Sequence, residues 1–169
     1  ARRSGKSVLM RQYAKQIIDY GNAKEDILII NCEDPRFIEL DISLLQKIYE
    51  TYLEFLAPRQ KPHIILDEIQ QISGWEKWVR TMHELRKAHI IVSGSNAHLL
   101  SKELATLLTG RHLDITLFPL DFKEYLLFNN LILKDRLDIV AKRLEIKRLF
   151  WKYMEFGGFP EVALGSESK

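Results

Sequence analysis

The sequence has little of what marks a disulfide-stabilised or membrane-spanning protein. Cys32 is the only cysteine among the 169 residues, so no disulfide can form within the chain. A reducing compartment fits this composition, and we expect a cytoplasmic protein. Apolar runs such as Leu131, Ile132 and Leu133 are far shorter than the ~18 residues that a membrane-spanning helix needs. We therefore expect no membrane partner.

A strong charge of one sign is absent as well. The net charge is +2, with 28% charged and 46% hydrophobic residues, which is ordinary for one globular domain with its own core. The overall charge therefore gives no argument for nucleic acid or a membrane surface. Lys142, Arg143, Lys147 and Arg148 form a local basic cluster. A DNA phosphate patch and a solvated helix face are both open, and the intervening Glu145 favours the solvated face.

What is present is a regular alternation of short apolar runs and amphipathic stretches. The runs are typical of buried parallel strands and cover residues 27–34, 63–70, 89–96 and 112–120. The stretches carry apolar residues at helical spacing and cover residues 7–20, 42–57, 75–87 and 97–108. This alternation predicts an α/β fold with a parallel sheet flanked by helices. After Asp121 the pattern is helical, which predicts an all-helical appendage, and "GGFP" at 157–160 predicts a rigid turn.

The first residues complete a phosphate-binding pattern. A P-loop reads Gly, four residues, Gly, Lys and then Ser or Thr, and Gly5, Lys6 and Ser7 match its end. The first glycine would lie one residue before Ala1. In such a loop, backbone N–H groups at the helix start bind phosphate, the lysine reaches the β and γ phosphates, and the hydroxyl ligates Mg²⁺. A chance match in a basic terminus is the alternative.

Two adjacent acids follow a buried apolar run. In "IILDE", Asp67 and Glu68 come directly after the strand expected from residue 63. Buried carboxylates without partners are costly, and a Mg²⁺ ion with a water would account for both. Asp67 would then hold the metal and Glu68 would polarise the attacking water. A solvated acidic loop is the alternative. The presence of the last residues of a P-loop motif in the same alternating α/β sequence disfavours that alternative.

Two further polar segments are candidates for the same site. Ligands of open α/β sheets bind outside the carboxyl ends of the strands, so Ser95 or Asn96 could contact the γ-phosphate or the attacking water. Ordinary turn chemistry explains these residues equally well. Arg111 in "TGRH" could neutralise transition-state charge in its own or a neighbouring subunit. Its spacing alone favours a helix-terminal arginine that balances the helix dipole.

The sequence resembles the prokaryotic AAA-type ATPases that are common in archaea. The resemblance runs from Arg2 to about Val162, and its segments are "RRSGKS", "ILDEIQ", "VSGSNAHLL", "LLTGR", "LFPLDFKEYL" and "YMEFGGFPEV". It implies a P-loop sheet of five parallel strands with the P-loop strand in the middle. The loop residues that it assigns to nucleotide binding are Arg2, Arg3, Ser4, Gly5, Lys6 and Ser7.

The same resemblance implies roles for the acids and for the later polar residues. It places Lys6 and Ser7 on the phosphates and Mg²⁺ and makes Asp67 and Glu68 the acidic pair of the site. It puts Ser95 or Asn96 in the sensor position, and it raises Arg111 as a sensor or finger. An Arg111 that acts on a neighbour's nucleotide would require a homo-oligomer.

The sequence departs from the family pattern at both ends. The first P-loop glycine and the strand before it are absent, so we expect the natural protein to extend upstream by at least one strand. Family members usually continue past Gly-Gly-Phe-Pro into a second, often nuclease-like domain. We therefore expect an ATPase core at 1–120 and a helical extension at 121–169. The extension would lead to a further domain that binds a DNA or protein partner.

These motifs predict ATP binding and Mg²⁺-dependent hydrolysis coupled to a conformational change. One alternative is a nucleotide-gated switch or scaffold that turns over slowly and carries the same motifs. The other is a P-loop kinase that acts on a small molecule. A kinase does not need a water-activating acid beside the Mg²⁺ aspartate, so Glu68 favours hydrolysis.

Overall fold

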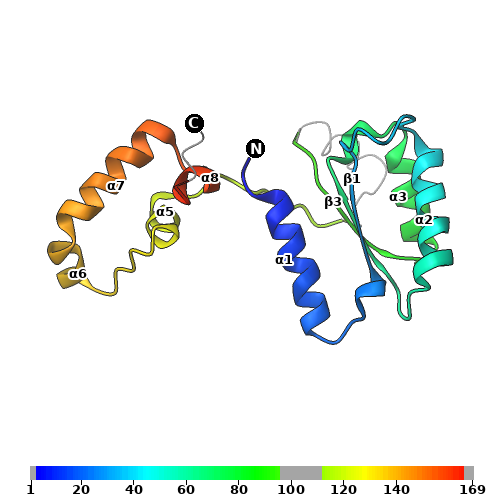
Figure 1. The fold of residues 1–169 in the computed structure, drawn as a ribbon, viewed down its shortest axis with the longest axis horizontal. Coiled ribbons are helices and arrows are strands. Elements are labelled where there is room, and N and C mark those ends of the chain that lie inside the picture. The colour runs from blue at the N-terminus through cyan, green and yellow to red at the C-terminus, as the bar shows by residue number, and fades with distance from the viewer. Residues whose placement is uncertain (1–2, 96–111, 166–169) are drawn as a thin grey trace. The chain divides into compact units, whose positions relative to one another are not determined.

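The computed structural model describes residues 3–95 and 112–165, and the chain forms two compact units (Figure 1). The sheet unit is Ser7–Asp114, and the helical unit combines Ala1–Lys6 with Ile115–Lys169. The two units have separate hydrophobic cores. The fold of each unit is therefore described by itself.

The sheet unit is built on a three-stranded parallel sheet in the order β1-β2-β3. Its strands are β1 (Ile27–Asn31), β2 (His63–Asp67) and β3 (His89–Val92). Leu66 of β2 lies opposite Ile30 and Val92. Because the strands are parallel, their carboxyl ends meet at one edge, where the polar residues of all three apolar runs gather. The predicted α/β class with a parallel sheet is confirmed.

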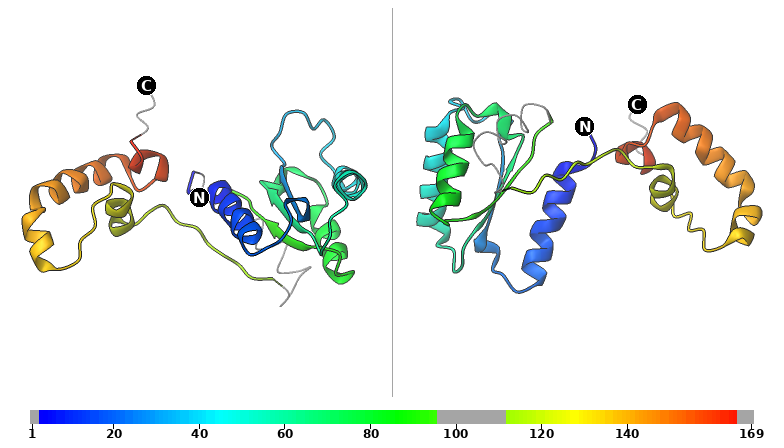
Figure 2. Two further views of the ribbon diagram at one scale, coloured as in Figure 1. Left: turned by 60° about the horizontal axis from the view of Figure 1, so that its bottom comes forward. Right: turned by 180° about the vertical axis from the view of Figure 1, so that it is seen from behind.

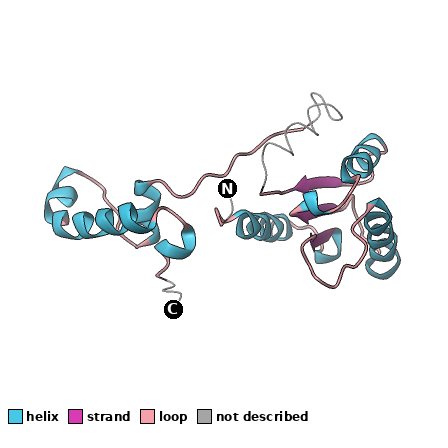
Figure 3. Ribbon diagram, turned by 90° about the horizontal axis from the view of Figure 1, so that it is seen from above, coloured by secondary structure: helices cyan, strands magenta, loops and turns pink. Residues whose placement is uncertain are grey.

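Helices cover both faces of this sheet, as Figures 2 and 3 show. They are α1 (Lys6–Asp19), α2 (Ile42–Leu56) and α3 (Trp75–Glu84). Successive strand residues point to opposite faces, so Ile64 and Leu66 pack in the cluster of α2 and α3. Ile65 packs instead against Met10 and Ala14 of α1. Burial on both faces explains why the strands read as continuous apolar runs.

The larger core lies between the sheet and the pair α2 and α3. Trp75 and Trp78 are buried there, and the indole N–H of Trp78 donates to Gln46 Oε1 at 3.0 Å. Asp41 caps the start of α2 by accepting the backbone N–H groups of Ser43 and Leu44. The helix ends at Leu56, and Ala57, which follows it, has a left-handed backbone. Capping and burial together set the position of α2.

The helical unit contains four helices in its described part, as the sequence predicts for the residues after Asp121. They are α5 (Phe122–Phe128), α6 (Arg136–Ala141), α7 (Arg143–Phe156) and α8 (Pro160–Ala163). Their buried residues form a separate cluster of Tyr125, Leu126, Leu131, Leu149 and Ala163. Gly157 ends α7 at φ 79°, and Pro160 opens α8, so the "GGFP" segment is the turn between two helices.

The predicted strand at 112–120 is wrong. The described residues of this segment are in neither strand nor helix, and Leu113, Ile115 and Phe118 are exposed. A strand forms only where a neighbouring backbone supplies hydrogen bonds, and this segment has none in the described sheet. Its last residue, Leu120, instead donates to Gly158 O at 2.7 Å within the helical unit. The predicted helix at 97–108 lies outside the described residues.

Candidate functional site

Asp67 is the centre of a polar cluster at the carboxyl edge of the sheet. Its carboxylate accepts hydrogen bonds from the hydroxyls of Ser93, which follows β3, and of Ser7, the second residue of α1. The Ser7 Oγ to Asp67 Oδ2 distance is 2.5 Å, although the two residues are 60 positions apart. Asp67 is only 9% exposed, and two O–H donors satisfy a carboxylate that burial would otherwise penalise. The sheet thus brings the helix start and the first acid together.

Glu68 leaves the strand in a strained conformation. Its backbone is left-handed, with φ 53° and ψ 45°, and it opens a short 3-10 helix, η2 (Ile69–Gln71). The carboxylate oxygen Oε2 accepts the Ser95 backbone N–H at 2.9 Å and the Gln70 side-chain N–H at 2.6 Å. A left-handed non-glycine residue persists only where its surroundings determine it, often at functional sites.

The Asp67 and Ser7 oxygens fit a magnesium donor set. Mg²⁺ prefers hard oxygen ligands and is typically held by one or two carboxylates together with waters and substrate phosphates. Ser7 Oγ and Asp67 Oδ2 lie 2.5 Å apart, and these two oxygens would be the ones to hold the ion. The donor atoms present are therefore the ones that a magnesium–triphosphate site uses.

The structure brings together four of the predicted site residues: Ser7, Asp67, Glu68 and Ser95. Three others, Arg2, Asn96 and Arg111, lie outside the described residues.

The remaining predicted loop residues belong by their contacts to the helical unit: Arg3, Ser4, Gly5 and Lys6. Arg3 and Gly5 have positive φ angles of 60° and 90°, and Ser4 is buried. A Cβ atom on Gly5 would lie 3.7 Å from Pro160 Cγ. A backbone that alternates into the left-handed region is common in loops whose N–H groups form anion-binding concavities.

The sequence prediction missed two residues of this cluster. Ser93 bonds Asp67, and the strand register contains the signal, because Val92 lies opposite Leu66 and the next pair is 93 with 67. Gln70 bonds Glu68, and only its position two residues beyond the acid pair hints at this contact. Both depend on the local path of the chain after a strand end.

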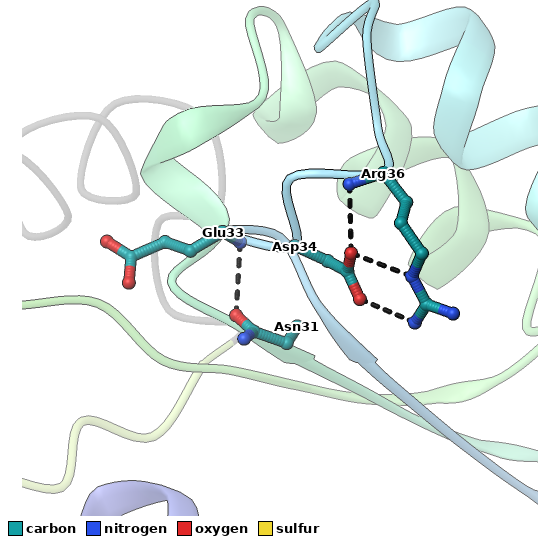
Figure 4. A network of polar contacts seen from close by, with 4 residues as sticks. All are labelled: Asn31, Glu33, Asp34 and Arg36. Atoms are coloured by element: carbon teal, nitrogen blue, oxygen red, sulfur yellow. Dashed lines mark hydrogen bonds and ion pairs between the residues drawn. The ribbon is translucent and has the colours of Figure 1, made fainter.

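The loop after β1 borders the same edge (Figure 4). The Arg36 guanidinium donates to both Asp34 oxygens, at 2.9 and 2.6 Å. Together with the Arg36 backbone N–H, it lowers the pKa of Asp34 to about 2. Glu33 donates its backbone N–H to Asn31 Oδ1 at 3.0 Å. These bonds hold the loop in place and pair the charges of Asp34 and Arg36.

Cys32 directly follows β1 and lies beside Asp67 at the carboxyl edge of the sheet. Its backbone N–H donates to Asp67 O at 2.9 Å, and its side chain is fully buried. Burial, together with the neighbouring charges of Asp67 and Glu68, raises the pKa of its thiol to about 12. This thiol stays protonated at neutral pH.

The fold and the cluster define a class, the P-loop nucleoside triphosphatases. The chain belongs to the AAA family, because a family of AAA domains matches residues 1–126. Membership indicates nucleotide binding and ATPase chemistry in general terms. In the described part of the chain, no helix combines the length and apolar character needed to cross a membrane.

Similar proteins extend well beyond this chain. An uncharacterized protein of Haemophilus influenzae is 37% identical over 167 residues, which cover 98% of this chain and 39% of that protein. An uncharacterized protein of Methanocaldococcus jannaschii is 34% identical over 163 residues, which cover 96% of this chain and 35% of that protein. The chain therefore spans less than two fifths of these curated relatives. No solved structure matches it significantly.

Proposed function

We propose that this chain binds ATP and hydrolyses it with Mg²⁺, and that hydrolysis drives a conformational change in a larger protein. The observation that carries the proposal is the bond between Ser7 Oγ and Asp67 Oδ2. It joins the end of the phosphate-loop pattern to the first acid of the acidic pair. A serine at a helix start and an aspartate at a strand end are the two protein ligands of magnesium in P-loop enzymes.

Each predicted residue has a role in this proposal. The backbone of the loop from Arg2 to Gly5 cradles the phosphates, and Lys6 reaches the β and γ phosphates as a point charge. Ser7 and Asp67 hold Mg²⁺, which neutralises charge on the transferring phosphoryl group when bound. Glu68 accepts a proton from the attacking water.

The segment after β3 completes the site. The Ser95 backbone N–H already holds the Glu68 carboxylate at 2.9 Å, which supports a place for Ser95 beside the reacting groups. Ser95 or Asn96 would sense the γ-phosphate, and Arg111 would neutralise transition-state charge. If Arg111 acts on a neighbour's nucleotide, the active form is a homo-oligomer.

Single-turnover hydrolysis of ATP by the intact natural protein tests the role of Glu68. We expect Glu68→Gln to bind ATP as the wild type does but to hydrolyse it about a hundredfold more slowly, because the amide cannot accept the proton. Glu50→Gln is the matched control, since Glu50 is an exposed acid on α2. Equal rates for the wild type and Glu68→Gln would remove Glu68 from the mechanism.

The same experiment separates the alternative functions. A slow switch or scaffold binds ATP tightly and releases little phosphate even before Glu68 is changed. A small-molecule kinase transfers the phosphoryl group to an acceptor, and free phosphate does not appear. Release of free phosphate that depends on Mg²⁺ and on Glu68 supports the hydrolase.

Partners belong to the whole protein, because the chain spans less than two fifths of its relatives. We propose that segments beyond this chain supply the P-loop strand and a further domain that binds a DNA or protein partner. We also propose that the protein works in the cytoplasm, which fits a chain whose one cysteine is a buried thiol.

A further inference from the structure

Gln70 joins the two polar strand ends at the carboxyl edge of the sheet. Its side-chain Nε2 donates to Glu68 Oε2 at 2.6 Å and lies 3.4 Å from Ser95 Oγ. Ser95 in turn donates its backbone N–H to the same Glu68 oxygen at 2.9 Å. The three residues therefore form a closed set of contacts between the end of β2 and the segment after β3.

The orientation of the Gln70 amide follows from its neighbour. An ionised carboxylate only accepts hydrogen bonds, so the NH₂ group must face Glu68. The amide oxygen Oε1 is then buried and has no hydrogen-bond partner among the described residues. A buried carbonyl without a donor is unfavourable, and a side chain of equal length without it would avoid this loss. Fold stability alone therefore does not account for an amide at this position.

We propose that Gln70 is a positioning residue for ATP hydrolysis, which rests on the proposed role of Glu68 as the base. Its N–H group fixes the direction of the Glu68 carboxylate through the 2.6 Å hydrogen bond. Its contact with Ser95 couples this direction to the segment that would sense the γ-phosphate. A base that is displaced by about 1 Å loses much of its rate advantage.

The test compares Gln70→Met with Gln71→Met in the intact protein. Methionine keeps the length of the side chain and removes the amide, and Gln71 is an exposed neighbour whose side-chain amide donates to Glu33 Oε1 at 3.2 Å. We expect Gln70→Met to lower kcat about tenfold to a hundredfold, with the KM for ATP nearly unchanged. The Tm of Gln70→Met should stay near that of the wild type. The substitution removes the hydrogen bond to Glu68, but it also removes the buried carbonyl that has no donor, and the two effects oppose each other.

The split between kcat and KM distinguishes positioning from simple packing. Loss of the N–H donor should lower kcat and leave the KM for ATP nearly unchanged in Gln70→Met, and neither constant should change in Gln71→Met. Gln70→Glu is a second variant of the same shape that sets a like charge against Glu68. It should lower kcat further at neutral pH.

The outcomes separate this inference from the proposed function. If Glu68→Gln slows hydrolysis as expected while both Gln70 variants keep the kcat of the wild type, the role of Gln70 is overturned and Glu68 remains the base. If Glu68→Gln hydrolyses ATP like the wild type, the proposed function fails and the role of Gln70 fails with it. A loss of rate in Gln71→Met equal to that in Gln70→Met also overturns the assignment.

Discussion

Glu68 carries a backbone strain that its own neighbours maintain. A left-handed conformation costs a non-glycine residue about 1–3 kcal/mol, and Glu68 holds φ 53° directly after β2. Hydrogen bonds from Gln70 and Ser95 fix its carboxylate. The turn aims this carboxylate toward the segment after β3 while Asp67 stays in line with the strand. Two adjacent acids thereby have different surroundings and different proposed tasks.

Cys32 permits a prediction at the scale of one side chain. Because burial raises the pKa of its thiol to about 12, and the thiolate is the reactive form, we expect a disulfide reagent to modify Cys32 about a thousandfold more slowly at pH 8 than a free thiol. Mass spectrometry of the peptide that carries Cys32 measures the rate. Protein unfolded in urea is the control and should react at the normal rate, whereas fast modification of the folded protein would contradict the burial.

At the scale of elements, strand ends rather than strand interiors hold the polar residues. The sequence predicts runs that include the polar residues after each strand, such as 63–70 and 89–96. The strands are shorter, because β2 ends at Asp67 and β3 ends at Val92, just before Ser93. The following residues turn away to bond side chains of the neighbouring strand end. Polar residues at the end of an apolar run therefore predict the position of a site, but they do not predict the last residue of the strand.

The connection between α7 and α8 depends on the absence of a side chain at Gly158. Its carbonyl accepts the Leu120 backbone N–H at 2.7 Å, and a Cβ there would lie 2.0 Å from Leu120 O and 2.9 Å from Tyr153 Cε2. We expect Gly158→Ala to destabilise the helical unit by about 3 kcal/mol, because backbone must move to admit the methyl group. Hydrogen exchange of peptides from α7 and α8 measures the effect within this unit.

Gly165→Ala is the matched control for this substitution. Gly165 has φ 69° and nothing within 4 Å of an added Cβ, so its replacement should cost only about 1 kcal/mol of backbone strain. Equal protection of α7 and α8 in the two variants would show that the close approach at Gly158 does not limit stability.

At the scale of the whole molecule, Asp26 ties two distant connections of the sheet unit. It is fully buried and accepts backbone N–H groups from Ala23 at 3.1 Å, Arg59 at 2.6 Å and Gln60 at 3.1 Å. Burial acts to raise the pKa of this carboxyl, and the three N–H donors outweigh burial, so the pKa is lowered from its ordinary value. The ionised form of Asp26 therefore stabilises the folded state.

The sign of this shift predicts how stability depends on pH. A folded-state pKa below the unfolded value of about 4 gives stability that is full above pH 4 and is lost as pH falls through the folded pKa. We expect Asp26→Asn to have a lower Tm than the wild type at pH 7, and the difference to shrink toward pH 3. Thermal unfolding followed by circular dichroism at both values tests this. Asp19→Asn, at an exposed position on α1, should show neither effect.

The sequence anticipated much of the sheet unit and little of the contacts inside its site. Helical spacing predicted α1, α2 and α3 because each buries one face locally. It failed at 112–120, where apolar composition was present but the described residues pair with none of the three strands. The sequence predicts that Ser7, Asp67 and Glu68 share one site. It does not predict Gln70, because the direction of that side chain is set by a 3-10 turn, which leaves no periodic pattern in the sequence. The predicted division of the chain at residue 120 stays a prediction.

The amino-acid sequence by itself determined which segments are apolar, which are amphipathic and which residues carry the chemistry, because burial and helix geometry leave periodic traces along the chain. Only the tertiary structure decided that Ser7 and Asp67 share a hydrogen bond, that Ser93 supports Asp67, and that Gln70 and Ser95 hold Glu68. These contacts depend on strand order and register, which follow from hydrogen bonds between segments far apart in the sequence.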